Sequence, residues 1–270
     1  MKTVRTIAEL RAVLAPLRAS TEIGLVPTMG AFHAGHLSLI EAARRENAVV
    51  VVSIFVNPTQ FGPGEDLDRY PRDEERDSRL AEEAGVDVLF VPAVEELYPE
   101  GFQTWVEVTE LSQGMEGAAR PGHFRGVATV CTKLFNIVRP ARAYFGQKDA
   151  QQAAVVERLA RDLDLELEIS VLPTVRDDDG VALSSRNAYL LPKEREAARA
   201  IRRALLAGED AYRAGAHPDA VARTILAGER RLVPDYVEIA RLNGRLVLTI
   251  AARAGRTRLI DNVVLEEEKP

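Results

Sequence analysis

The chain has 270 residues and a net charge of −6 at pH 7; 46% of its residues are hydrophobic and 28% are charged. This length suits one large domain or two smaller ones. The acidic balance argues against nucleic-acid binding, and no apolar run approaches the ~20 residues of a membrane span. With Cys131 as the one cysteine no internal disulfide can form, and the N-terminus lacks the apolar core of a signal peptide, so we expect a cytoplasmic protein.

Strands and helices alternate through the first 172 residues. A capping-box pair, Thr6 and Glu9, opens a predicted helix over residues 7–17. Helical spacing of apolar residues predicts further helices after His36 to about 47 and at 73–84, 127–138 and 151–161. Short apolar runs predict strands at 23–26, 48–56, 86–91, 141–145 and 165–172. This alternation predicts an α/β fold with a doubly wound, Rossmann-like parallel sheet. Cys131 falls on the apolar face of the 127–138 helix, where we expect a core residue rather than a nucleophile.

The pattern changes after residue 175. Polar turns at 176–180 and 183–187 precede predicted helices at 193–214 and 218–229. Three strand-like runs follow at 236–241, 246–251 and 258–264, and the acidic end of the chain, 266–270, suggests a solvated tail. We therefore expect a first domain over residues 1–175 and a smaller α+β domain over residues 176–270.

The stretch V-P-T-M-G-A-F-H-A-G-H-L at residues 26–37 carries His33 and His36, with Gly35 between them. A strand precedes it and an amphipathic helix follows, so both imidazoles are expected where a strand turns into a helix. The N-terminus of a helix attracts anions because its first N–H groups lack partners, and glycine lets a phosphate approach the backbone. Two imidazoles at i and i+3 share a helix face and can donate hydrogen bonds to a phosphate chain.

Two other interpretations of this stretch were weighed. A strand–glycine–helix turn that binds nothing is common in α/β proteins, and these residues alone leave that alternative open. A zinc site is disfavoured because the H-E-x-x-H pattern is absent. The chain also has only four histidines and one cysteine for the three or four ligands that zinc needs.

Polar residues also follow other predicted strands. Asn57 and Gln60 leave the strand that ends near residue 56, and neutral amides can orient hydroxyl and carboxylate groups. Lys148 could bind a phosphate, and Asp149 could accept a hydrogen bond from a ribose hydroxyl. The two hydroxyls and the guanidinium of the S-S-R segment at 184–186 suit the binding of oxyanions. Each group could equally be an ordinary loop, helix start or cap. Their joint placement favours a ligand site, because ligands of such sheets bind beyond the carboxyl ends of the strands.

M-G-A-F-H-A-G-H resembles the H-x-G-H motif of the HIGH nucleotidyltransferase superfamily. Five further segments follow in order: V-N-P-T-Q-F, R-P-G-H-F-R-G-V-A-T-V, Y-F-G-Q-K-D-A-Q-Q, D-G-V-A-L-S-S-R-N-A-Y-L and R-L-I-D-N. With them, nearly the whole chain resembles the pantoate–β-alanine ligase family. The H-x-G-H motif indicates only the superfamily, whereas N-P-T-Q-F and S-S-R-N narrow the resemblance to this family.

The resemblance implies an ATP-dependent ligase. Pantoate and ATP would give pantoyl adenylate and pyrophosphate, and β-alanine would then displace AMP to give pantothenate. Mg²⁺ would arrive on the ATP phosphates rather than in a protein cage. The family also implies a homodimer and a second domain that closes over the ATP site. Another HIGH-superfamily nucleotidyltransferase and a non-catalytic nucleotide-binding regulator remain the alternatives.

The resemblance also assigns residues. His36 would be the proton donor, His33 would hold the phosphates, and Lys148, with Arg186, would counter the pyrophosphate charge. Gln60 would bind pantoate and lie near β-alanine, and Gln152 would bind pantoate. The residues expected to bind ATP are Met29, Gly30, Ala31, Phe32, His33, Ala34, Gly35, His36, Gly146, Gln147, Lys148, Asp149, Val175, Leu183, Ser184, Ser185 and Arg186.

Two positions depart from the family pattern. Gln147 stands where the family usually has glutamate, so this chain lacks a carboxylate at the position before Lys148. Ala150 stands where an aromatic residue is often found. Neither departure touches Lys148 or Asp149.

Overall fold

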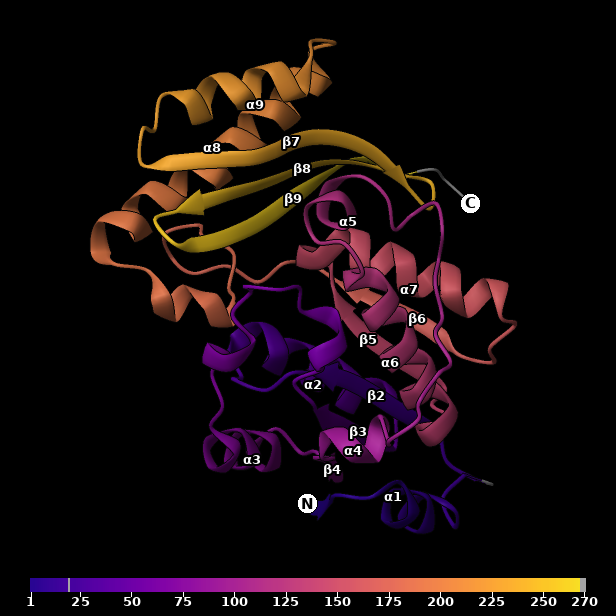
Figure 1. Ribbon diagram of the computed structural model, residues 1–270. Coiled ribbons are helices and arrows are strands. Elements are labelled where there is room, and N and C mark those ends of the chain that lie inside the picture. The colour runs from indigo at the N-terminus through magenta and orange to yellow at the C-terminus, as the bar shows by residue number, and fades with distance from the viewer. Residues whose placement is uncertain (19, 268–270) are drawn as a thin grey trace. The chain divides into compact units, whose positions relative to one another are not determined.

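The computed structural model describes residues 1–18 and 20–267, which form two compact units (Figure 1). The first unit holds residues 1–146 and 155–172; the second holds 147–154 and the chain from 173 onward. The division into functional domains after residue 175 stays a prediction.

Six strands of the described chain form one parallel sheet in the order β1-β4-β3-β2-β5-β6. They are β1 (Lys2–Val4), β2 (Ile23–Thr28), β3 (Val49–Ile54), β4 (Val88–Phe90), β5 (Arg142–Gly146) and β6 (Glu168–Leu172). The predicted doubly wound α/β sheet is confirmed. Strand β1 was not predicted, because only one of its three side chains is buried and no apolar run marks it. This strand is defined by its pairing with β4 at the sheet edge.

The helices of this unit are α1 (Ile7–Leu14), α2 (Ala34–Glu46), α3 (Glu74–Glu83), α4 (Val94–Leu97), α5 (Met115–Ala119) and α6 (His123–Val138). Two 3₁₀ turns, η1 (Pro58–Gln60) and η2 (Leu67–Arg69), lie among them, and α7 (Ala150–Asp162) begins in the second unit and ends in the first. The capping box of Thr6 and Glu9 is confirmed. The helix that it opens ends at Leu14, because Pro16 has no N–H to continue the ladder. The short α4 and α5 were not predicted, since four or five residues show no helical period.

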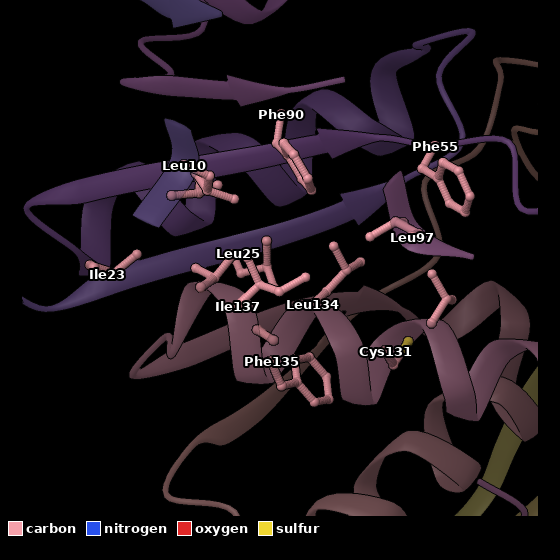
Figure 2. Packing of buried hydrophobic residues seen from close by; sticks show 14 of the residues in the cluster. Leu10, Ile23, Leu25, Phe55, Phe90, Leu97, Cys131, Leu134, Phe135 and Ile137 are labelled. Carbon is pink, nitrogen blue, oxygen red and sulfur yellow. The ribbon is translucent and has the colours of Figure 1, made fainter. Parts of the chain in front are cut away.

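One face of the sheet packs against α1 and α6 (Figure 2). Leu25 of β2 points into this cluster, beside Leu10 of α1 and Leu134 of α6, and all three are fully or almost fully buried. Burying one such side chain contributes roughly 1.5–3 kcal/mol. Cys131 of α6 lies in the same cluster at 4% exposure, and burial raises the pKa of its thiol to about 12. The prediction that Cys131 is a core residue is confirmed.

The opposite face packs against α2 and α3. Val26 and Val52 point to this side, because successive side chains of a strand alternate between the faces. Ile40 of α2 and Ala81 of α3 complete the cluster, and none of the four is exposed. Both faces are therefore covered, which is why these strands are continuous apolar runs in the sequence.

The strand order reverses next to β2. This strand pairs with β3 on one side and with β5 on the other. The crossover through α2 leads to β3, whereas β5 continues the sheet in the other direction. Ligands of open α/β sheets bind outside the carboxyl ends of the strands at such a switch point. The turn that follows β2 therefore occupies the position where a ligand is expected.

The second unit contains α8 (Pro192–Arg213), α9 (Pro218–Ala227) and the turns η3 (Gln147–Asp149) and η4 (Ser185–Tyr189). Its antiparallel sheet consists of β7 (Leu232–Leu242), β8 (Arg245–Ala254) and β9 (Thr257–Glu267). Apolar residues of α8 and α9 pack against the sheet, as the α+β prediction requires. The solvated tail was predicted too long: Glu266 and Glu267 continue β9, and residues 268–270 lie outside the described chain.

Candidate active site

The backbone turns sharply after β2. Gly30 has φ +80° and Ala31 φ +53°, so a non-glycine residue occupies the left-handed region, at a cost of about 1–2 kcal/mol. The Thr28 hydroxyl accepts from the Gly30 amide at 3.2 Å and donates to the Ser53 carbonyl of β3 at 2.7 Å. The turn is thus anchored to the neighbouring strand.

Asp77 of α3 holds the same turn. Its carboxylate is 1% exposed and accepts from the amides of Ala31, at 2.6 Å, and Phe32, at 2.8 Å. Arg76 donates to the Phe32 carbonyl at 3.0 Å. Burial raises the pKa of Asp77, although the two amide bonds act in the opposite direction. Bonds from amides to a carboxylate are strong, and they offset the strain at Ala31. Glycine is required at position 30, since a Cβ there would lie 2.9 Å from the Asp77 carboxylate.

His33 and His36 stand at the N-terminus of α2, both half-buried, with ring centroids 4.1 Å apart. Nδ1 of His33 accepts from the Gly35 amide at 3.1 Å, and Nδ1 of His36 accepts from the His33 amide at 3.4 Å. Because Nδ1 accepts in both rings, each neutral imidazole carries its proton on Nε2. Nε2 is therefore the donor end of each neutral ring, at a helix N-terminus that favours anions.

Gln60 lies on η1, directly beyond the carboxyl end of β3. Asn57 caps this turn and donates through Nδ2 to Gln60 Oε1 at 3.0 Å. Gln60 Nε2 lies 3.4 Å from the Met29 sulfur, which brings Gln60 beside the turn that follows β2. Since Oε1 accepts from Asn57, the amide nitrogen is the end that suits the carboxylate or hydroxyl of a ligand.

Two side chains contact the backbone carbonyl of Gln60, and a third holds one of them. His123 Nδ1 lies 2.8 Å from the Gln60 carbonyl, and Arg120 donates to that carbonyl at 3.2 Å. Arg120 also lies 3.1 Å from His123 Nε2 and makes a two-pronged ion pair with Glu65. Arginine can only donate, so Nε2 of His123 accepts and Nδ1–H donates. Burial, and then the charge of Arg120, lower the pKa of His123 to about 4, so the ring is neutral at pH 7.

Gly126 lets α6 approach η1. A Cβ at this position would lie 2.5 Å from the Thr59 carbonyl and 2.8 Å from Gln60 Cα. The Gly126 carbonyl accepts from Asn57 Nδ2 at 3.2 Å. The R-P-G-H-F-R-G segment thus supplies both the space and the hydrogen bonds that place Gln60.

The second unit holds the other predicted ATP-binding residues except Gly146, which ends β5 in the first unit. Lys148 lies on η3, its side chain 19% exposed and its Nζ 3.4 Å from Asp149 Oδ1. The Leu183 amide donates to the Val175 carbonyl at 3.0 Å. These two residues, both predicted to bind ATP, are therefore hydrogen-bonded to each other. Ser184 caps η4 and accepts from the Arg186 amide at 3.3 Å. Gln152 is half-buried on α7.

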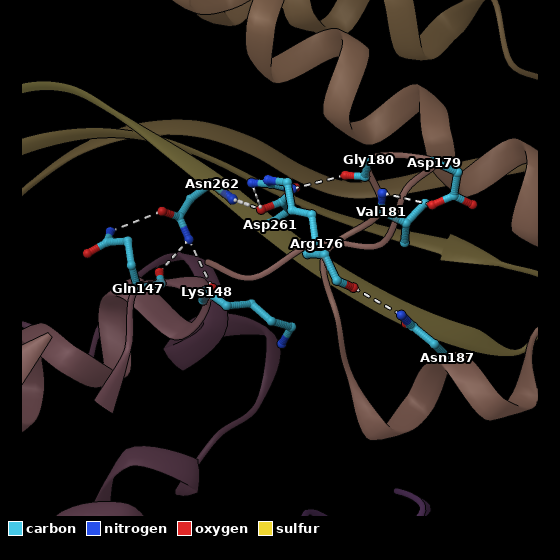
Figure 3. Close-up of polar contacts among 10 residues, drawn as sticks. Gln147, Lys148, Arg176, Asp179, Gly180, Val181, Asn187, Asp261 and Asn262 are labelled. Carbon is cyan, nitrogen blue, oxygen red and sulfur yellow. Dashed lines mark hydrogen bonds and ion pairs between the residues drawn. The ribbon is translucent and has the colours of Figure 1, made fainter. Parts of the chain in front are cut away.

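Several supporting residues were not found from the sequence. Asp77 lies in a charged helix whose pattern contains no hint of a buried carboxylate. Arg120 and His123 belong to a segment that was used only for the resemblance. The same is true of Asn262, which donates to the backbone of η3 (Figure 3). Sequence patterns identify side chains that face a ligand by their chemistry, but not the residues that hold them.

Within residues 1–18 and 20–267, no group of three or more His, Cys, Asp or Glu side chains could hold a metal ion. None of the helices in that part of the chain is long and apolar enough to cross a membrane.

The sheet topology and the capped turn at its switch point define a Rossmann-like α/β protein. The family model for pantoate-beta-alanine ligase matches residues 2–264. The chain belongs to this family.

Curated relatives and solved structures agree with this assignment. Pantothenate synthetase of Moorella thermoacetica is 54% identical, covering 98% of this chain and 99% of its own. The Roseiflexus castenholzii enzyme is 53% identical, over 98% and 100%. Pantothenate synthetase from Thermus thermophilus superposes with a TM-score of 0.93 at 49% identity, covering 98% and 99% of the two chains. The Francisella tularensis ligase, complexed with beta-gamma ATP and beta-alanine, has a TM-score of 0.84 at 37% identity and 98% coverage of both chains.

Proposed function

We propose that this chain condenses pantoate with β-alanine to form pantothenate, using ATP and releasing AMP and pyrophosphate. The observation that carries the proposal is the His33–His36 pair, whose Nδ1 atoms are engaged in the turn. Their Nε2–H groups suit the phosphates of ATP. The family membership and the relatives' names supply the substrates.

The chemistry divides into two transfers. A pantoate carboxylate oxygen attacks the α-phosphorus of ATP, and the bond to pyrophosphate breaks. The β-alanine amine then attacks the acyl carbon of pantoyl adenylate, and AMP leaves. No covalent enzyme intermediate is needed, so the main catalytic needs are positioning and charge stabilisation. His36 donates the proton that the leaving group needs, and His33 holds the phosphates.

The proposed substrate contacts follow from the chemistry of the side chains. Gln60 and Gln152 bind pantoate by their amides, and Gln60 also lies near β-alanine. Lys148 and Arg186 counter the charge of pyrophosphate. Residues 29–36, 146–149, 175 and 183–186 bind ATP, so the predicted first domain binds ATP and pantoate and the second closes over the nucleotide. Mg²⁺ enters with ATP, bound through its phosphates.

Three further attributes belong to the proposal. The stretch from Met29 to His36 is a HIGH motif, the active form is a homodimer, and the enzyme works in the cytoplasm.

The test is a coupled assay of AMP and pyrophosphate release. Protein, Mg–ATP and pantoate are mixed with and without β-alanine. AMP release that requires both pantoate and β-alanine supports the ligase. Pyrophosphate release with a different phosphate ester, and none with pantoate, would indicate another nucleotidyltransferase. ATP binding without any turnover would indicate a regulator.

A further inference from the structure

Asn262 of β9 contacts η3 through its side chain (Figure 3). Its Nδ2 donates to the carbonyls of Gln147, at 2.8 Å, and Lys148, at 2.9 Å. Its Oδ1 accepts from Gln147 Nε2 at 3.0 Å. The residue is 4% exposed, so these bonds are sheltered from water. One amide therefore fixes the backbone on which Lys148 stands.

Asp261, the neighbour of Asn262, extends this arrangement. Its carboxylate, 4% exposed, accepts from Arg176 at 2.6 and 3.0 Å and from the Asn262 amide at 2.8 Å. Arg176 follows Val175 directly and also donates to the Gly180 carbonyl at 3.2 Å. Two adjacent residues of β9 thus tie η3 to the segment around Val175.

We infer that Asn262 is a positioning residue for the adenylation step, acting through Lys148. This inference rests on the proposed role of Lys148 in binding the phosphates of ATP. Lys148 is a flexible side chain, and its ammonium reaches a defined point only if its backbone is held. A displacement of about 1 Å at such a group can cost 10²-fold in rate. Neither the sequence motifs nor the family resemblance assigns Asn262 a role.

The experiment compares Asn262→Asp with Asn136→Asp. In Asn262→Asp a carboxylate oxygen replaces Nδ2 and faces two carbonyl oxygens. Asn136 lies exposed on α6 and donates to the Thr132 carbonyl at 2.9 Å, so the same substitution there makes a matched control. We expect Asn262→Asp to lower kcat/KM for ATP by about 10- to 100-fold, with KM for β-alanine unchanged. The control should retain wild-type values.

Lys148→Met and the double variant with Asn262→Ala separate positioning from stability. If Asn262 acts through Lys148, the double variant is no slower than Lys148→Met alone. If Asn262→Asp fails to fold, the kinetics of Asn262→Ala replace those of Asn262→Asp in the test. The melting temperature of every variant is measured to show that it is folded. Multiplicative losses in the double variant, or wild-type kinetics in folded Asn262→Ala, would overturn the inference. Full activity of Lys148→Met would instead overturn the assignment of Lys148, and the inference with it.

Discussion

Among single residues, His33 and His36 each use one ring nitrogen for the fold and the other for the proposed ligand. Nδ1 accepts a backbone hydrogen bond, and Nε2 is the proposed donor to phosphate. His36 Nδ1 accepts from the His33 amide at 3.4 Å, and the neutral ring keeps its proton on Nε2. The local turn thus selects the tautomer that can donate to a phosphate. Methylation or loss of Nε2 would spare the turn but remove the donor.

Replacement of His36 tests this division. We expect His36→Ala to slow adenylate formation by ~10²-fold or more, the scale of losing an acid–base group or an oxyanion donor. Pyrophosphate release from ATP and pantoate measures the step. In His36→Asn the new Oδ1 can replace Nδ1 as acceptor, so this variant should fold normally and still be slow. His217→Ala, at an exposed histidine, is the control, and near wild-type turnover in His36→Ala would contradict the assignment.

The buried, neutral ring of His123 makes the free energy of unfolding depend on pH in the acidic range. Burial lowers its pKa to about 4 from an ordinary value of 6.5. The unfolded chain therefore binds a proton between these two pH values while the folded chain does not. The stabilisation by neutral His123 is complete above pH 6.5 and is lost as the pH falls toward 4, by up to roughly 3 kcal/mol.

The corresponding measurement is the urea midpoint at pH 7 and at pH 4.5. Between these pH values we expect the midpoint of His123→Gln to fall less than that of wild type. His217→Gln should behave like wild type. An equal fall in His123→Gln and wild type would show that His123 titrates normally in the folded protein.

At the scale of elements, α3 acts on α2 through one carboxylate. Asp77 accepts from two amides of the turn that precedes α2. This contact connects a helix on one face of the sheet with the predicted phosphate site. This contact could not be predicted from the sequence of α3, because most of its residues are charged and nothing distinguishes Asp77 from the exposed ones.

Asp77→Asn should disturb this turn. One carboxylate oxygen becomes an NH₂ group that cannot accept, which leaves a buried amide unpaired at a cost of about 1–3 kcal/mol. We expect a lower melting temperature and a KM for ATP about 10-fold higher, since a displaced turn binds phosphate poorly. Asp73→Asn on the same helix is the control, because asparagine caps a helix N-terminus as well as aspartate. Equal behaviour of the two variants would contradict the role of Asp77.

At the scale of the whole molecule, ATP should stabilise the folded chain by mass action. A ligand at 100 times its Kd contributes about 2.7 kcal/mol to the free energy of unfolding. If His33 and Lys148 both bind ATP, His33→Ala and Lys148→Met should each reduce the rise in melting temperature that Mg–ATP produces. Lys193→Met, at an exposed lysine of α8, should leave the rise intact. An undiminished rise in either site variant would remove that residue from the ATP site.

Elements with local sequence signals could be predicted from the amino-acid sequence. Apolar periodicity located the central strands and most of the long helices, because covering both faces of a parallel sheet demands continuous apolar runs. Side-chain chemistry at strand ends pointed to His33, His36 and Gln60, and motif order supplied the family.

The residues that hold these side chains in place could not be predicted, because their contacts form only in the folded chain. Asp77, His123 and Asn262 contact partners 46, 63 and 115 positions away in the chain. A hydrogen bond between such distant segments produces no periodic pattern in the sequence, because it depends on the path of the backbone of each segment in the folded chain. The edge strand β1 could not be predicted for the same reason. It is a strand because it pairs with β4, and its own composition does not mark it as one.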